Sequence, residues 1–386
     1  MQFKALLLAG LFSLILLSEA KGDNEPADSV VYAGLPFVKF DSDLGFIGGA
    51  LADRYYYEEG VSPYSNLTEV RTQYSTLGMF YWSMLHERLQ FAGTDWRVEG
   101  EFIFDRMLMD NYFGLGNSSD FEQDQWDEDF YNYESRLAEL TLQGRYPLLS
   151  PEADNHLDLL LRGEAFYYDY TPFDDNNEAL IFNDEEVEAI GDDPFIYVAG
   201  CGLLWDSRDR EVDTRRGVYS EISAMGSPGL LTYRDPAMFY SAEFRGFYSV
   251  SSLDNLIMAT RLGGEGVAGD VPFWFMPHLG GEWTLRGYHL RRFRDEGKVY
   301  NSFLLRNWLV NFDFLDFRAG LQVFTEGGKT FGKHSGGLLE DFSGNYHHSV
   351  GGGLLLSAFT EDFILRVDYA ASDETGRLYM NVGYVY

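Results

Sequence analysis

Residues 157–167 read LDLLLRGEAFY, a stretch in which apolar and polar side chains largely alternate. Its odd positions carry leucine, glycine, alanine and tyrosine, whereas Asp158, Arg162 and Glu164 stand at even positions. A period of two residues is typical of a β-strand with one apolar and one polar face. The same alternation returns at 363–369 and at 378–386, so the sequence predicts an all-β chain.

The overall composition supports this prediction. Phe, Tyr and Trp make up 17% of the 386 residues, and 41 glycines accompany only 11 prolines, which is typical of strands rather than of disorder. The formal charge of −32 argues against a nucleic-acid partner, because binding phosphates requires Lys and Arg on the surface. The single cysteine, Cys201, excludes an internal disulfide and a cysteine-based metal cluster.

The N-terminus is typical of an exported protein. Lys4 precedes an apolar run from Ala5 to Leu17, and Ser18 and Ala20 supply the small residues of a cleavage site. This pattern predicts a secretory signal peptide over residues 1–20. An uncleaved anchor is the alternative, but a membrane-spanning helix needs about 20 apolar residues. We expect residues 21–34 to form a short periplasmic segment after cleavage.

Two architectures fit alternating strands in an exported chain, namely a soluble sandwich and an outer-membrane barrel. The strands are long, aromatic residues gather near their ends, and the last strand carries Tyr384 and Tyr386 as an aromatic C-terminal signal. These features favour a transmembrane antiparallel β-barrel over residues 35–386, whose apolar face contacts outer-membrane lipid, including lipopolysaccharide. We expect 16 strands, with 14 as the alternative. We place them near 35–41, 44–57, 66–75, 79–91, 95–107, 132–147, 155–170, 193–206, 217–228, 237–251, 255–268, 298–313, 316–326, 346–359, 363–370 and 377–386.

The predicted connections differ in length between the two ends of the barrel. Counting from a periplasmic N-terminus, the long connections fall on the outer side, as expected for such barrels. They are 108–131, 171–192, 229–236, 269–297 and 327–345. Two of these loops are rich in acids and lack bases, which indicates either a solvated rim or, alternatively, carboxylates that bind divalent cations.

The connection 269–297 differs from the other loops, because it contains four arginines in a chain that is short of bases. Residues 280–288 read GGEWTLRGY, and residues 291–295 read RRFRD. Here the sequence resembles the BamA/TamA family of bacterial surface antigen barrels, whose hallmark is a (Val/Leu)-Arg-Gly-(Phe/Tyr) tetrad in a long loop that folds back into the barrel. The matching residues are Leu285, Arg286, Gly287 and Tyr288.

Further matches to this family stand in the expected order over most of residues 30–386. Residues 113–117 resemble a Phe-Gly-Ile-Gly-Asn segment of shorter members, and 365–369 resemble the penultimate strand. Residues 205–217 resemble an Asp-Thr-Arg-Asp…Pro-Thr-Arg-Gly turn, in which Asp213 stands near the place of the missing proline; the matching residues are Asp206, Arg208, Asp209 and Gly217. Phe324 and Gly328 match a Phe-x-Asp-x-Gly strand, with Glu326 in place of the aspartate.

The residues themselves suggest a partner for the arginine of the tetrad. Period two places Arg318, Gln322 and Glu326 on one face of strand 316–326, which should face the lumen. A buried guanidinium requires an opposite charge, so we expect Arg286 to pair with Glu326 and to hold the loop across the barrel. The family resemblance implies the same pair. The alternative is that Arg286 only caps an exposed loop.

The resemblance implies a function in outer-membrane protein or lipid assembly, translocation or transport, with a weak seam between the first and last strands and a lumen plugged by loop 269–297. Few residues separate the predicted cleavage site from the first strand, so we expect a barrel-only member without POTRA domains, whose client or periplasmic partner is a separate protein. A passive pore for small solutes is the alternative. The seven histidines and the serines form no hydrolase motif, so we expect no enzyme, cofactor or metal site.

Overall fold

The computed structural model describes residues 29–149, 156–191, 194–228, 236–250, 256–269, 271–312, 316–340, 345–358 and 363–383. The predicted signal peptide over 1–20 and the aromatic signal at Tyr384 and Tyr386 lie outside the described residues.

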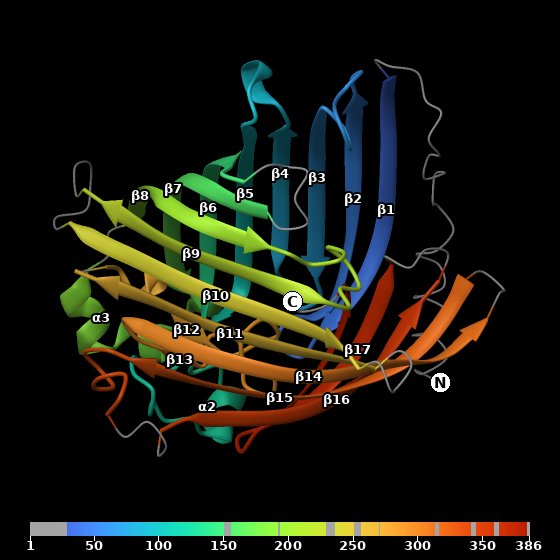
Figure 1. Cartoon of the computed structure of the whole chain (residues 1–386). Coiled ribbons are helices and arrows are strands. Elements are labelled where there is room, and N and C mark those ends of the chain that lie inside the picture. Colours follow the sequence, from blue (N-terminus) through green and yellow to red (C-terminus); the bar gives the residue numbers. More distant parts are fainter. Residues whose placement is uncertain are drawn as a thin grey trace.

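Sixteen antiparallel strands form one closed barrel, in which each strand pairs with its neighbours along the chain and β18 pairs with β1. The prediction of a 16-strand transmembrane-type barrel is therefore confirmed, and the alternative of 14 strands is wrong. Figure 1 shows the strands as one tilted wall around the lumen. The strands of the wall are β1 (Ser29–Asp41), β2 (Gly45–Tyr57), β3 (Asn66–Ser75), β4 (Phe80–Arg88), β5 (Arg97–Asn111), β6 (Asn132–Pro147), β7 (His156–Pro172), β8 (Phe195–Asp206), β9 (Gly217–Ser227), β10 (Ala237–Ser249), β11 (Leu256–Ala268), β14 (Gly297–Phe312), β15 (Phe317–Phe331), β16 (His347–Ser357), β17 (Ile364–Ala371) and β18 (Gly376–Val382).

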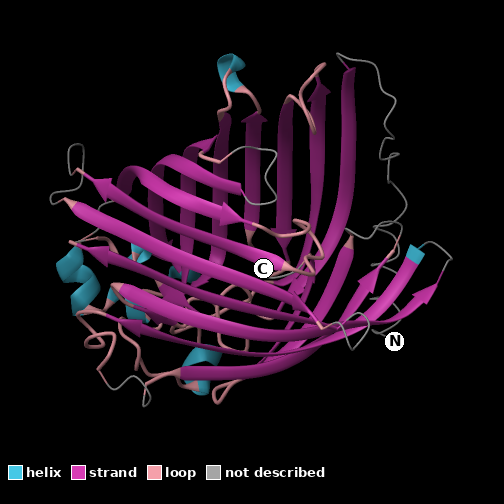
Figure 2. Cartoon of the chain, in the orientation of Figure 1, coloured by secondary structure: helices cyan, strands magenta, loops and turns pink. Residues whose placement is uncertain are grey.

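Helical segments are short and lie at the ends of the strands, as Figure 2 shows. No helix in the described part of the chain is long and apolar enough to cross a membrane. The helices are η1 (Phe91–Gly93), α2 (Gln123–Asp127), η2 (Phe173–Asp175), η3 (Leu180–Phe182), α3 (Glu185–Ile190) and η4 (Phe273–Phe275). A separate two-stranded sheet of β12 (His278–Leu279) and β13 (Phe293–Arg294) lies within the connection from β11 to β14.

The start of the barrel corrects the sequence prediction. We expected a periplasmic segment over 21–34 and a barrel from residue 35, but β1 begins at Ser29. Residues 29–34 belong to the same strand, since the ladder with β2 runs from Ser29, opposite Tyr57, through Gly34, opposite Ala52. On its other side, the described pairs of β1 with β18 are at Phe40 and Asp41, near the end of β1.

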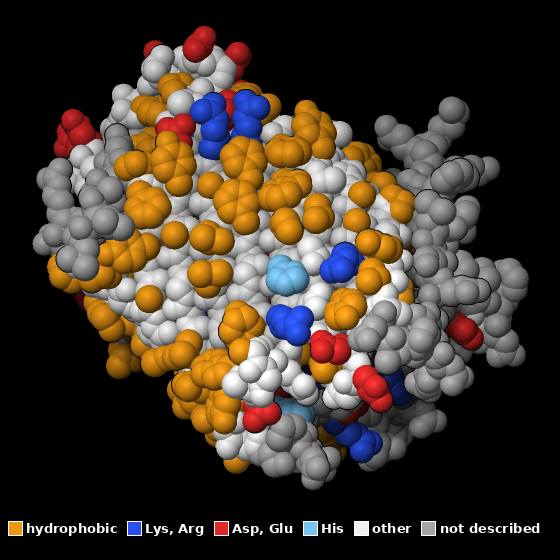
Figure 3. Space-filling view, turned by 90° about the horizontal axis from the view of Figure 1, so that it is seen from above, with side chains coloured by type: hydrophobic (Ala, Val, Ile, Leu, Met, Phe, Trp, Pro, Cys, Tyr) orange, Lys and Arg blue, Asp and Glu red, His pale blue; other side chains and the backbone are white. Residues whose placement is uncertain are grey.

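The two faces of the wall are reversed relative to a soluble protein. Large apolar side chains such as Leu142, Ile222 and Val323 are exposed on the outside, whereas Arg306 and Asp368 are buried inside. An outward apolar band with a polar lumen is the pattern of a barrel that contacts lipid. Figure 3 shows this apolar surface on one face of the molecule.

The long connections meet at one end of the barrel, called here the long-loop end. Gly116 bridges to Arg294, and the Nδ1 atom of His334 lies 2.8 Å from a carboxylate oxygen of Glu186. Connections 112–131, 173–191 and 271–296 and the segment after β15 therefore lie at one end and contact one another, and the prediction that they share one end is confirmed. Of the predicted outer connection 229–236, residues 229–235 lie outside the described part. The turn between β8 and β9 lies at the opposite, short-turn end.

Candidate functional site

The connection from β11 to β14, described from residue 271, folds into the lumen. Its two short strands, β12 and β13, bring the tetrad at 285–288 between them. Leu285 and Arg286 are 0% exposed and Tyr288 is 1% exposed, so the tetrad is enclosed by the barrel. The alternative that Arg286 caps an exposed loop is excluded by this burial. We call residues 271–296 the lumen loop.

The structure brings Arg286 and Glu326 together. The Nε and Nη2 atoms of Arg286 donate hydrogen bonds of 3.0 and 2.6 Å to Oε1 of Glu326. The backbone N–H of Arg286 donates a third, of 2.7 Å, to Oε2. Both carboxylate oxygens are thus used, and three charge-assisted bonds fix the loop to β15. The guanidinium carbon also lies 3.4 Å from the centroid of the Phe324 ring, which places this predicted residue in the same site.

The remaining donor of Arg286 reaches a second strand. Its Nη1 atom donates to Oδ2 of Asp368 on β17 at 2.7 Å, and Arg366 donates to the same oxygen at 2.7 Å. Arg366 also bonds Glu282 of the lumen loop, which accepts two hydrogen bonds from Asn381 of β18. The pair is therefore part of a buried network that joins β15, β17 and β18 to the loop. Sequence reasoning missed this extension, although the alternation at 363–369 already placed Arg366 and Asp368 on the polar face.

The other residues of the tetrad explain the tight approach of the loop. Gly287 has a φ of +94°, and a Cβ there would lie 3.1 Å from the carbonyl carbon of Ala371, so only glycine fits without strain. The Tyr288 hydroxyl donates a hydrogen bond of 2.6 Å to Asp373, in the turn between β17 and β18. Leu285 packs in an apolar cluster with Leu279, Tyr288, Phe293 and Tyr300. A Cβ at Gly328 would lie 2.8 Å from a methyl carbon of Leu279, which explains this predicted position as well.

The arginines that follow the tetrad tie the loop to other elements. Arg292 makes two hydrogen bonds of 2.8 Å to Glu374, and it donates to the carbonyl of Ser119 at 2.7 Å. Arg291 pairs with Asp110 near the end of β5, and Arg294 donates to the carbonyl of Phe273 at 2.8 Å. The loop is thus anchored on both sides of the barrel end, and each cation has a partner of its own.

The lumen loop also contacts the place where β1 and β18 meet, which we call the seam. Asp43, in the turn after β1, lies 2.8 Å from Arg377 of β18 and accepts a 3.0 Å hydrogen bond from the backbone of Leu290. Its other loop neighbour is His289, at 3.0 Å. Burial by itself raises the pKa of Asp43, but the hydrogen bond with His289 and the charge of Arg377 hold that pKa below its usual range. Sequence reasoning missed this contact.

The predicted turn at 205–217 lies at the short-turn end, away from the tetrad. Arg208 donates to both oxygens of Asp206, at 3.0 and 2.7 Å. One oxygen of Asp209 accepts from the backbone of Arg215 at 2.9 Å, which closes the turn. Gly217 has a φ of +109°, and a Cβ there would lie 2.2 Å from the carbonyl oxygen of Ser207. These residues shape the turn and do not meet the lumen loop.

The same turn places Asp213 inside the lumen. Its carboxylate lies 3.2 Å from Arg318 of β15 and 3.5 Å from Arg306 of β14, and it accepts a hydrogen bond of 3.4 Å from Trp308. The Asp213 side chain is buried, so the turn fills the lumen from the opposite end against the wall that also holds Arg286. The sequence placed Asp213 only at the site of a missing proline.

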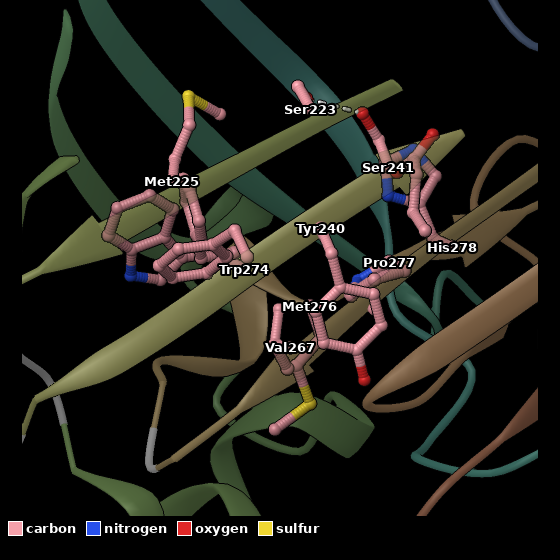
Figure 4. Close-up of a pocket in the computed structure, with 13 residues that line it drawn as sticks. Ser223, Met225, Tyr240, Ser241, Val267, Trp274, Met276, Pro277 and His278 are labelled. Atoms are coloured by element: carbon pink, nitrogen blue, oxygen red, sulfur yellow. Dashed lines mark hydrogen bonds between the residues drawn. The ribbon is translucent and has the colours of Figure 1, made fainter. Parts of the chain in front are cut away.

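A cavity of ≈ 340 Å³ lies between the inner face of β9, β10 and β11 and residues 274–278 of the lumen loop. Figure 4 shows Ser223 and Ser241 of the wall, joined by a 2.8 Å hydrogen bond, together with Trp274, Met276 and His278 of the lumen loop. Burial lowers the pKa of His278 well below its usual range, so this histidine is neutral near pH 7. The cavity does not include any residue of the tetrad. Among the described residues, no three His, Cys, Asp or Glu side chains are grouped so that they could hold a metal ion, which leaves the divalent-cation interpretation of the acidic loops unsupported.

Comparison with known families gives this geometry its context. The model of the Omp85 superfamily domain matches residues 67–385. The chain belongs to the Omp85 superfamily. Barrels of this superfamily reside in the bacterial outer membrane, and their members assemble or translocate other molecules. None of the curated proteins matches the sequence.

Three solved structures are similar in fold at low sequence identity. BamA from Haemophilus ducreyi lacking POTRA domains 1–3 is 13% identical, with a TM-score of 0.59 over 97% of this chain and 76% of that one. CdiB from Escherichia coli is 10% identical, with a TM-score of 0.63 over 96% and 67%. CdiB from Acinetobacter baumannii is 10% identical, with a TM-score of 0.52 over 92% and 59%. At these identities the likeness concerns the fold.

Proposed function

We propose that this Omp85 barrel acts in the assembly or translocation of protein or lipid at the outer membrane, and that its lumen loop is the internal plug of this activity. The observation that carries the proposal is the dry ion-pair network of Arg286. Burying an arginine between two strands of the wall costs desolvation free energy. Only well-formed ion pairs and hydrogen bonds offset that cost. An open diffusion pore has no need of such a network across its lumen.

The geometry supports a mechanism in which the wall and the plug act together. The lumen loop bonds β15 and β17 through Arg286, and it bonds the turn after β1 through Leu290. Within the described residues, the register pairs of the seam are Phe40–Met380 and Asp41–Tyr379, with further bonds between Ser42 and Leu378. A client that enters the lumen must displace the loop, whereas one that enters the membrane must part the seam. We propose that the barrel acts on a client and with a periplasmic partner. The proposal includes no enzymatic step.

The test is an assembly assay on cells that lack the gene. Outer-membrane proteins that fail to reach their heat-resistant folded form, and recover when the natural gene is restored, would support the proposal. Complementation with Arg286→Ala should fail, while Arg71→Ala, at a solvated ion pair elsewhere in the lumen, should succeed. Normal outer-membrane protein and lipid composition in the deletion strain would overturn it.

A passive pore is the second candidate, and one observation favours it. The side of the lumen formed by β3 to β10 carries charged side chains that remain in contact with water, such as Arg71, Arg97 and Arg162. Single-channel conductance of the refolded mature protein, with and without residues 271–296, separates the two functions. A steady conductance in the intact protein would favour the pore, whereas a closed barrel that conducts only after deletion of the loop would favour the plugged barrel.

A further inference from the structure

The outward face of the barrel is apolar except at a few positions, and four of these form a charged cluster. Arg106 shares its face of β5 with exposed Phe102, and Arg136 and Glu134 share their face of β6 with exposed Leu140 and Leu142. Asp169 likewise lies on the face of β7 that carries exposed Tyr167. All four side chains therefore point toward lipid rather than into the lumen. Figure 3 shows small groups of basic side chains set into the apolar surface.

Three of the four residues form one row across three strands, and Glu134 stands two positions from Arg136 on β6. Arg106 stands directly opposite Arg136, which stands directly opposite Asp169. Two guanidiniums in this position repel each other unless an anion lies between them. Glu134 supplies one, because its Oε1 atom accepts from Arg106 at 3.0 Å and from Arg136 at 2.6 Å. The other neighbour of Arg136 is Asp169, at 3.2 Å.

The two arginines remain open to a further ligand. Both side chains are 43% exposed, whereas Glu134 beneath them is 14% exposed. The bonds of Arg106 use Nε and Nη2, and its Nη1 atom has no hydrogen-bond partner in the described part of the chain. Guanidinium donors arranged as a planar fork match the oxygens of a phosphate.

The cluster lies near the long-loop edge of the apolar band. Beyond Arg106, β5 continues only to Asn111 before the connection that carries α2, and β6 begins at Asn132, just before Glu134. Aromatic side chains stand close by, since Phe80 of β4 is the register partner of Arg106. Aromatic residues mark the headgroup level of a membrane, and the cost of a lipid-facing arginine falls toward that level. The long loops place this edge at the outer leaflet.

We propose that Arg106 and Arg136 bind a phosphate of a phosphorylated glycolipid headgroup in the outer leaflet. Glu134 holds the two guanidiniums side by side, and the phosphate occupies their exposed edge. Asp169, whose carboxylate is also exposed, accepts hydrogen bonds from sugar hydroxyls beside that phosphate. A carboxylate next to two arginines is unfavourable for a ligand that offers only phosphate oxygens, and this alternation of donors and acceptor selects a glycolipid over a phospholipid.

The test measures retention of lipid by the full mature barrel in detergent, with native mass spectrometry as the readout and three probes: bis-phosphorylated lipid A, dephosphorylated lipid A and phosphatidylglycerol. The natural protein should retain bis-phosphorylated lipid A in preference to the other two. The double variant Arg106→Ala/Arg136→Ala should lose this retention by about tenfold or more, because each arginine contributes charge-assisted hydrogen bonds. The control is Arg54→Ala/Arg88→Ala, two outward arginines near the short-turn end, which should retain the lipid unchanged.

A second variant protects the test against a failure to fold. Arg106→Lys/Arg136→Lys keeps both charges but removes the planar forks, so it should fold and retain less lipid A than the natural protein. A heat-dependent shift of mobility on a gel reports the folded barrel in every variant. Retention of lipid A by the alanine pair, retention by the lysine pair equal to the natural protein, or an equal loss of phosphatidylglycerol would each overturn the proposed glycolipid site.

Discussion

The two sides of the lumen carry similar charged residues in different surroundings. On the side formed by β14 to β18, Arg306, Glu326 and Asp368 are buried, because the lumen loop and the turn with Asp213 pack against this side. On the side formed by β3 to β10, Asp110 is buried where Arg291 of the lumen loop reaches it, but side chains such as that of Arg71, 41% exposed, keep contact with water. The comparison teaches that an inward charge makes no fixed contribution to the free energy of unfolding of a barrel. Its contribution depends on what fills the lumen beside it.

The largest expected effect comes from breaking the buried ion-pair network of Arg286. Arg286→Ala leaves Glu326 and Asp368 buried without their shared cation, so we expect a loss of about 3–5 kcal/mol in the free energy of unfolding. Urea titration of the refolded barrel in lipid measures it. Arg286→Glu should cost at least as much, and adding Glu326→Arg should restore part of the loss. A double variant no more stable than either single variant would contradict the pairing.

The turn between β8 and β9, which carries Asp213, offers the second test of the buried side formed by β14 to β18. Asp213→Asn keeps the shape of the side chain and tolerates the local φ of +49°, but it removes the negative charge between Arg306 and Arg318. We expect a loss of about 1.5–3 kcal/mol, the range of a hydrogen bond to a charged group. Glu101→Gln, on the solvated side, is the matched control in the same urea titration. Equal effects of the two substitutions would mean that the turn does not shield the lumen.

The seam contact adds a smaller, pH-dependent effect. Because the pKa of Asp43 is lower in the folded protein than in the unfolded chain, the folded state binds fewer protons at acid pH. This contribution to stability is fully present above the unfolded pKa of about 3.9 and is lost as the pH falls through the folded pKa. The protection factors of the amides at 288–292, corrected for the intrinsic exchange rate at each pH, should therefore fall in acid, and Asp43→Asn should remove that dependence. An unchanged pH profile in the variant would rule out Asp43 as its source.

The smallest expected effect lies on the solvated side. Arg71 pairs with Glu69 at 2.9 Å, but both side chains are partly exposed, so Arg71→Ala should cost about 0–1 kcal/mol. The same urea titration gives the value. A cost near that of Arg286→Ala would remove the distinction between the two sides. A change in ion selectivity of the loop-deleted barrel, without a change in stability, would sharpen it.

The sequence predicted most of the wall and only part of what fills it. Period two is a local property, so all sixteen strands could be placed, and the inward face of 316–326 located Glu326 as a partner for Arg286. Asp43 could not be found in this way, because its partner Leu290 is 247 residues away and lies in a loop without periodicity. Asp213 was missed for the same reason. The predicted first strand, 35–41, was six residues too short, because the start of β1 is set by its pairing with β2 from Ser29 onward.

The short pairing of β1 with β18 has a consequence for how the ring forms. In every other neighbouring pair, the two wall strands follow each other along the chain. Each such pair forms as a hairpin with a modest entropy of loop closure. The hydrogen bond of Ser42 with Leu378 joins residues 336 positions apart. Contacts of such sequence separation form late, because the chain between them must be ordered first. The open sheet of hairpins should therefore form before the barrel closes. In the final step of folding, residues 40–43 should pair with residues 377–380.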